Sequence, residues 1–157
     1  MSPENEFMRE AIRLSFETMQ NNTGGPFGAV IVKDGKIIAR GFNRVVSTND
    51  PTAHAEIVAI REACEVLKDF QLTGCEIYTS CEPCPMCLAA IYWARPDKVY
   101  YANSKSDAAG IGFDDQFIYD EINMDFSKRK IPLVRLMEDE ALAAFNEWSS
   151  KEDKTKY

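Results

Sequence analysis

The stretch that decides the fold reads Tyr78-Thr79-Ser80-Cys81-Glu82-Pro83-Cys84-Pro85-Met86-Cys87. It joins an expected strand at 75–80 to an expected helix at 84–94, because Pro83 suits the position ahead of a helix and Pro85 suits its first turn. Cys84 and Cys87 are three residues apart, so both sulfurs face the same side of that helix. Thiolates there also feel the positive end of the helix dipole, and the pair therefore indicates a metal site.

A second motif, Thr52-Ala53-His54-Ala55-Glu56, lies upstream and contains the only histidine of the chain. Zinc takes nitrogen and sulfur ligands in a tetrahedron, and a catalytic zinc site leaves one of the four positions to water. His54, Cys84 and Cys87 are therefore the expected ligands, and Glu56 is the expected proton carrier. The combination of H-x-E with a later P-C-x-x-C is the established signature of zinc deaminases.

Two other metal sites fit the same cysteines. Cys81 is a candidate fourth ligand, which would close a structural Cys₃His zinc site. Cys81, Cys84 and Cys87 also form C-x-x-C-x-x-C, but the ferredoxin run continues with x-x-x-C-P, whereas Leu88-Ala89-Ala90-Ile91 follows here. An iron–sulfur cluster would then need Cys64 or Cys75. If all five cysteines were only small buried hydrophobic residues, the H-x-E motif would have no explanation.

The composition predicts one soluble domain that acts on a small molecule. A chain of 157 residues, 45% apolar and 27% charged, can bury a core of ordinary size. Its five cysteines, an odd number, favour a reducing cytoplasm over a disulfide framework. We expect no signal peptide and no membrane span. The net charge of −7 and the lack of a basic run argue against a nucleic-acid partner.

The apolar patterns predict helices and strands that alternate along a single domain, residues 1–157. The predicted helices cover 2–20, 53–67, 84–94, 117–122 and 138–150, and the predicted strands cover 27–33, 36–43, 75–80, 97–102 and 131–137. Asp34-Gly35 predicts a hairpin turn between the first two strands. A right-handed crossover predicts parallel pairing of the strands at 75–80 and 97–102.

Finer expectations concern the start of one helix and the buried face of another. Asp50 or Thr52 is the expected cap of the helix over 53–67. His54 and Glu56 are two residues apart, about 200° around a regular helix. We therefore expect His54 at the irregular first turn, with the metal site at the start of this helix. The helix over 138–150 is expected to bury four residues, Ala141, Leu142, Phe145 and Trp148.

Five segments resemble the small bacterial guanine deaminases, which belong to the cytidine deaminase superfamily. They are Gly24–Val30, Asp50–Glu56, Tyr78–Cys87, Ala90–Pro96 and Gly112–Asp115. The resemblance covers nearly the whole chain, including the terminal tyrosine. The zinc motif is specific to the superfamily, whereas the Phe-Asp-Asp stretch and the C-terminal tail point to guanine.

The resemblance implies an α/β fold, namely a three-layer α/β/α sandwich with a five-stranded mixed sheet. It also implies one zinc ion per chain and a homodimer. In this family the C-terminal segment can cross to the partner by domain swapping, so that the tail, residues 151–157, would cover an active site, that of its own chain or that of the partner. A frayed end is the alternative for this tail. The substrate-binding positions that it implies are Phe27, Asn43, Ala55 (through its backbone), Trp93, Asp115 and Tyr157.

The implied activity is the hydrolytic deamination of a purine base, guanine, to xanthine and ammonia, a step of purine catabolism. Zinc would acidify a water molecule, and Glu56 would carry its proton to the ring nitrogen N3 beside C2. An ionised Asp115 would accept from the N–H groups of guanine, whereas Asn43 can both donate and accept. Guanosine, cytosine and tRNA adenosine suit the same chemistry. A non-catalytic zinc or iron–sulfur binding module is the alternative from a different class.

Overall fold

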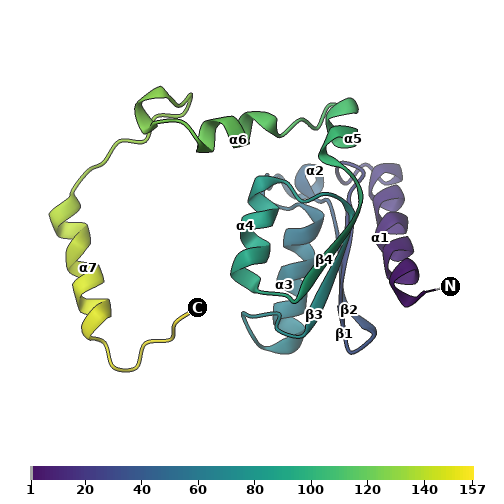
Figure 1. The fold of residues 1–157 in the computed structure, drawn as a ribbon, viewed down its shortest axis with the longest axis horizontal. Coiled ribbons are helices and arrows are strands. Elements are labelled where there is room, and N and C mark those ends of the chain that lie inside the picture. Colours follow the sequence, from purple (N-terminus) through teal and green to yellow (C-terminus); the bar gives the residue numbers. More distant parts are fainter. Residues whose placement is uncertain (1) are drawn as a thin grey trace. The chain divides into compact units, whose positions relative to one another are not determined.

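The computed structural model describes residues 2–157, and the chain divides into two compact units. The first unit ends at Asp115 and contains every strand in the described part of the chain (Figure 1). The second unit, Gln116–Tyr157, is built from helical elements joined by irregular segments. In the described residues, no helix combines the length and the apolar character that crossing a membrane requires.

The elements follow the expected order with three additions, two short helices and a 3-10 turn, and without the expected strand at 131–137. The helices of the first unit are α1 (Pro3–Gln20), α2 (Val45–Thr48), α3 (Ala55–Leu67), α4 (Pro85–Ala94) and α5 (Lys105–Gly110). Its strands are β1 (Gly28–Lys33), β2 (Lys36–Phe42), β3 (Cys75–Cys81) and β4 (Lys98–Asn103). The second unit contains α6 (Gln116–Ile122), a 3-10 turn (Phe126–Lys128) and α7 (Glu138–Ser150). The short helices α2 and α5 were expected as loop, because neither reaches two full turns with an apolar stripe.

The four strands form one mixed sheet in the order β2-β1-β3-β4. β1 pairs antiparallel with β2 and with β3, whereas β3 pairs parallel with β4. The hairpin turn has φ +50° at Asp34 and +69° at Gly35, the positive values that a two-residue type I′ turn needs. The α/β class, the mixed sheet, the hairpin and the parallel pair are therefore confirmed.

The prediction of five strands was wrong, because residues 131–137 are irregular. They lie in the second unit, whose described residues form no strand, so their backbone has no ladder partner within that unit. Pro132 also removes one N–H donor. Apolar β-branched residues indicate fit to a pleated, half-buried surface rather than an intrinsic strand preference, and here Ile131 and Val134 are 79% and 76% exposed.

The expectation that α7 buries one face was also wrong for the chain described here. None of its residues is buried, and Leu142, Phe145 and Trp148 are 50%, 73% and 44% exposed. Neither core cluster found in the described residues includes any residue of the second unit. An amphipathic pattern indicates that a face favours burial, but it does not say which surface supplies the cover.

Helices cover both faces of the sheet in the first unit. α1 lies on one face, and α3 and α4 lie on the other (Figure 1). Along β1 the side chains alternate between the two cores: Val30 and Val32 pack toward α1, whereas Ala29 and Ile31 pack toward α3. Because both faces are covered, β1 is buried along almost its whole length.

The backbone of α3 approaches β2 closely, and small residues make this possible. Ala55, Ala59 and Ala63 are fully buried on its inner face. A Cβ atom at Gly41 of β2 would lie 2.0 Å from the carbonyl oxygen of Ala55 and 2.6 Å from the nitrogen of Ala59, so only glycine fits. This contact fixes the first turn of α3 against the end of β2, and that turn carries Glu56 and follows His54.

Candidate active site

Two helix starts meet at the carboxyl end of β3. His54 is the N-cap residue of α3 and Cys84 is the N-cap residue of α4. The expected cap residues of α3 do not cap it, because Asp50 instead accepts from the backbone N–H of Thr52 at 2.8 Å and from its hydroxyl at 2.6 Å. The extended backbone at both N-caps leaves their side chains to point into the space between the helices.

The side chains of His54, Cys84 and Cys87 converge on one point. The Nδ1 atom of His54 lies 3.6 Å from the sulfur of Cys84 and 3.5 Å from the sulfur of Cys87. The three donor atoms all lie within 4.8 Å of one another, so the group could hold a metal ion. One imidazole nitrogen and two sulfurs are a donor set that suits zinc and leaves a fourth tetrahedral position open.

The proton chemistry of this group also fits a divalent cation. The thiol of Cys87, and secondly His54, interact with the sulfur of Cys84 and lower its pKa to about 4. The hydrogen bond with Cys84, then burial, and then the charges of Glu56 and Cys84 raise the pKa of Cys87, so a second negative sulfur beside the first is unfavourable. A bound cation would remove that repulsion and stabilise both thiolates together.

Glu56 lies in a buried position beside His54, Cys84 and Cys87, the three residues that form the metal group. It is only 6% exposed, and desolvation by burial raises the pKa of its carboxyl group. Its Oε2 atom lies 3.4 Å from the sulfur of Cys87, and its Oε1 atom lies 3.3 Å from the hydroxyl of Thr79. A buried carboxyl group with a raised pKa, next to a metal group and outside its ligand set, is typical of a proton-transfer residue.

The remaining cysteines lie outside the metal group. The sulfur of Cys81 lies 3.7 Å from the carbonyl oxygen of Ser104, and burial raises the pKa of this thiol to about 11. Cys64 and Cys75 are free thiols. Among the described residues, the set of donors that could hold a metal contains His54, Cys84 and Cys87 and no fourth protein ligand. This geometry therefore favours an open site over a closed Cys₃His site or an iron–sulfur cluster.

Asn43 is held in a fixed orientation near the end of β2. It is 5% exposed, its backbone N–H donates to the carbonyl of Phe27 at 3.1 Å, and its Oδ1 accepts from the N–H of Val45 at 3.1 Å. A Cβ atom at Gly24 would lie 2.0 Å from that Oδ1, so Gly24 provides the space that the side chain occupies. The side-chain oxygen of Asn43 is therefore bound within its own loop.

Phe27 and Asp115 lie in the same unit as the metal group. The half-buried ring of Phe27 meets the ring of Phe113 edge-on, with centroids 5.0 Å apart. Partial burial, and then the charge of the Cys84 thiolate, raise the pKa of Asp115, so this carboxylate feels the charge of the metal group. Ala55 is fully buried in the first turn of α3.

Two other expected substrate positions are not enclosed in the first unit. Trp93 is 62% exposed in the last turn of α4. It follows Cys87 by six residues, about 240° around the helix, and so lies on a different side. Tyr157 ends the second unit and is 70% exposed.

Thr79 and Phe113 contact predicted site residues but were not among the expected site positions. Side chains alternate along β3, so Thr79 lies on the same face as Ile77, toward α3 and Glu56. This alternation is the sequence pattern that could have predicted the contact. Phe113 follows a glycine-containing segment without periodicity, so no local pattern ties it to Phe27.

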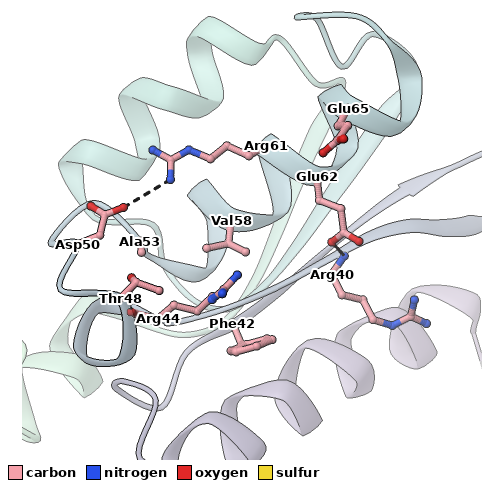
Figure 2. A pocket seen from close by; sticks show the side chains of 10 residues that line it. All are labelled: Arg40, Phe42, Arg44, Thr48, Asp50, Ala53, Val58, Arg61, Glu62 and Glu65. Carbon is pink, nitrogen blue, oxygen red and sulfur yellow. Dashed lines mark hydrogen bonds and ion pairs between the residues drawn. The ribbon is translucent and has the colours of Figure 1, made fainter.

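A separate cavity of about 610 Å³ lies between β2, α2 and α3 (Figure 2). None of the three metal-group residues lines it. Its charged residues contact one another, since Arg61 pairs with Asp50 at 3.6 Å and the backbone N–H of Arg40 donates to Glu62 at 2.9 Å. Guanidinium and carboxylate groups are mixed on its wall, so the cavity does not select a ligand of one charge.

This chain is similar to a known family of deaminases and to one full-length relative. The family model of the cytidine and deoxycytidylate deaminase zinc-binding region matches residues 1–103. The guanine deaminase of Bacillus subtilis (strain 168) is 54% identical over 151 residues, which cover 96% of this chain and 97% of that protein. Its crystal structure superimposes with a TM-score of 0.95 and covers 98% of both chains.

More distant relatives share only part of the chain. A tRNA-specific adenosine deaminase of Agrobacterium fabrum is 54% identical over 76 residues, 48% of this chain and 50% of that one. A guanine deaminase structure from Nitrosomonas europaea matches with a TM-score of 0.68 and 35% identity, over 73% of this chain and 65% of that chain. Because the family model spans well over half of the sequence, including the H-x-E and P-C-x-x-C motifs, the chain belongs to the cytidine and deoxycytidylate deaminase family.

Proposed function

We propose that this protein is a zinc-dependent guanine deaminase, which converts guanine and water to xanthine and ammonia. The observation that carries the proposal is the identity of 54% along almost the entire length of the guanine deaminase from Bacillus subtilis. The geometry supports the reaction class independently, since a buried carboxyl group lies 3.4 Å from one member of an open histidine and cysteine group.

His54, Cys84 and Cys87 would hold one zinc ion per chain. When bound, zinc would supply Lewis acidity that makes a water molecule easier to deprotonate near neutral pH. Glu56 takes up the proton of that water, and burial favours this uptake because it disfavours the charged carboxylate.

Glu56 then moves the proton to the substrate. It delivers the proton to N3 of guanine as the hydroxide oxygen adds to C2. It then takes the proton of the hydroxyl group now on C2 and gives it to the amino group, so that the C2–N bond breaks, ammonia leaves and C2=O forms. The carboxyl group starts and ends the cycle ionised, so a single residue serves both proton transfers. Its burial prevents competing exchange with solvent.

The proposed base contacts combine donors and an acceptor. The NH₂ group of Asn43 donates to an acceptor atom of the purine, because its Oδ1 is bound to the N–H of Val45. An ionised Asp115 only accepts, and it would select the N–H groups of guanine. The ring of Phe27, held edge-on by Phe113, packs against the purine. The backbone of Ala55 and the side chain of Trp93 complete the set.

We further propose a cytoplasmic homodimer with exchanged C-terminal segments. The five free thiols support a reducing compartment. The exposed apolar residues of the second unit, such as Leu142 and Phe145, support a partner surface. In such a dimer the tail, residues 151–157, would place Tyr157 over the active site of the partner, so that each site is closed by the other chain.

Ammonia release from a panel of substrates tests the function. Purified protein with its zinc content measured would be given guanine, guanosine, cytosine, adenine and a tRNA containing the target adenosine. We expect kcat/KM for guanine to exceed that for every other substrate. Zinc-loaded protein that releases no ammonia from guanine would contradict the proposal. Preferred turnover of the tRNA would instead indicate a tRNA-specific adenosine deaminase.

A further inference from the structure

Thr79 contacts the carboxyl oxygen of Glu56 that does not contact Cys87. It lies in β3, is 1% exposed, and its Oγ1 lies 3.3 Å from Oε1 of Glu56. The other carboxyl oxygen, Oε2, lies 3.4 Å from the sulfur of Cys87. The two oxygens of Glu56 therefore have different surroundings, one on the strand side and one on the metal side.

We propose that Thr79 is a positioning residue that fixes Oε1 of Glu56 and so makes Oε2 the oxygen that exchanges the proton. This inference rests on the proposed role of Glu56. The two oxygens of an isolated carboxylate are equivalent, and rotation about the Cγ–Cδ bond exchanges them. A hydroxyl that donates to Oε1 opposes protonation of that oxygen and stops the rotation, so the proton goes to Oε2.

A second acceptor allows the hydroxyl to serve both states of Glu56. Oγ1 of Thr79 also lies 3.0 Å from the carbonyl oxygen of Cys81, and a hydroxyl has a single hydrogen to donate. While Glu56 is ionised, its carboxylate is the stronger acceptor and takes that hydrogen. When Glu56 is neutral, the hydrogen can turn to Cys81, so the hydroxyl is never left buried without a partner. No proton passes through Thr79.

The test compares Thr79→Val, which keeps the shape and removes the hydroxyl, with Thr79→Ser, which keeps the hydroxyl. We expect Thr79→Val to lower kcat for guanine about 10- to 100-fold, the value of one hydrogen bond to a charged group. KM, zinc content and the affinity for the product xanthine should stay near wild type. Thr79→Ser should restore kcat to within about threefold of wild type, because the bond is restored.

The chain offers a matched control in Thr18→Val. Thr18 is also 1% exposed, and its Oγ1 has no hydrogen-bond partner among the described residues. Losing that hydroxyl should leave kcat unchanged. If Thr79→Val does not fold, Thr79→Ala removes the same hydroxyl without placing a methyl group against the carboxylate, and the same loss of kcat is expected.

The outcomes separate this proposal from the function on which it rests. Wild-type kcat in Thr79→Val, while Glu56→Gln is inactive, would overturn the positioning role and leave the function intact. Loss of zinc in Thr79→Val, or failure of Thr79→Ser to restore kcat, would show a structural role and would also overturn it. A wild-type protein that does not deaminate guanine would instead overturn the proposed function.

Discussion

The two units of the chain are held together in different ways. In the first unit, contacts join residues far apart in sequence: Glu10 of α1 pairs with Arg40 of β2 at 2.8 Å, and the backbone N–H of Gly28 donates to the hydroxyl of Ser80 at 3.0 Å. In the second unit, side chains contact residues close in sequence, as between Arg135 and Glu138 at 2.5 Å, or between Arg129 and the carbonyl of Met124 at 3.2 Å.

The first unit is therefore stabilised by its own long-range contacts, whereas, within the described residues of the second unit, the helix α7 lacks a surface that would cover its apolar side chains. An isolated helix shorter than about 12 to 15 residues is marginal in water, and α7 has 13 residues with none buried. The first unit contains both core clusters and every member of the metal group. Changes in the first unit should therefore affect metal binding and chemistry, whereas changes in the second should affect turnover without affecting the metal.

The largest effect is expected from Cys84→Ala. It removes one of the three converging donors, so we expect loss of zinc, loss of measurable deamination and a lower melting temperature, because metal binding stabilises the fold. Zinc analysis, an ammonia assay and a melting curve measure the three effects. Cys81→Ser is the matched control and should keep zinc and activity. Equal loss of zinc in Cys81→Ser would mean a closed site and would contradict the catalytic assignment.

Glu56→Gln should abolish most of the deamination while the protein keeps its zinc. The amide keeps the shape of the carboxyl group but cannot carry the proton, and general acid–base catalysis contributes roughly 10²–10⁴-fold. Because Glu56 would serve two transfers, we expect kcat to fall by at least the upper part of that range. Zinc content and melting temperature should be retained, since a buried neutral amide costs less to desolvate than a carboxylate.

The control for Glu56→Gln is Glu65→Gln, on the exposed side of the same helix. It should leave kcat within about twofold of wild type, because this carboxylate is far from any proton transfer in the proposed reaction. Activity of Glu56→Gln within about tenfold of wild type would remove the role that we assign to Glu56.

Deletion of residues 151–157 tests the second unit. We expect a folded, zinc-loaded protein in which kcat/KM for guanine falls about 10- to 100-fold, because a missing lid admits water and loosens the substrate. Tyr157→Ala, a milder change, should show part of the same loss. Steady-state kinetics with zinc analysis measures both. Full activity of the truncated protein would show that the tail has no part in the reaction.

The smallest effect concerns the two ion pairs of Glu10, one with Arg13 on the same helix and one with Arg40 on β2. Hydrogen bonds from Arg13, and then Arg40, lower the pKa of its carboxyl group from 4.5 to about 2. A lowered pKa contributes stability above about pH 4.5, and this contribution is lost as the pH falls toward 2. Since both arginine side chains are more than half exposed, we expect Glu10→Gln to cost on the order of 1 kcal/mol at neutral pH.

Urea unfolding of wild type and Glu10→Gln across this pH range measures the pair. The difference in the free energy of unfolding should shrink as the pH falls below 4.5. A difference that is the same at every pH would mean that lost packing, rather than charge, causes the destabilisation.

The sequence by itself determined the metal group and most of the first unit. Residue type and spacing predicted the group of His54, Cys84 and Cys87, because few arrangements of imidazole and thiolate ligands fit a metal; only the structure showed that Cys81 lies outside that group. The hairpin at Asp34-Gly35 and the parallel pair of β3 and β4 followed from local turn chemistry and from chain handedness. These features depend on residues close together in the chain or on general rules of topology.

Tertiary structure decided what depends on contacts between distant residues. The pairing of Thr79 with Glu56 spans 23 positions, and Gly24 makes room for Asn43 across the hairpin. The apolar residues at 131–137 and along α7 indicated burial, yet neither forms a buried element in the unit that contains it. A sequence pattern records that a face is apolar, whereas the strand ladder or the core that would cover it exists only when another part of a folded structure supplies the opposite surface.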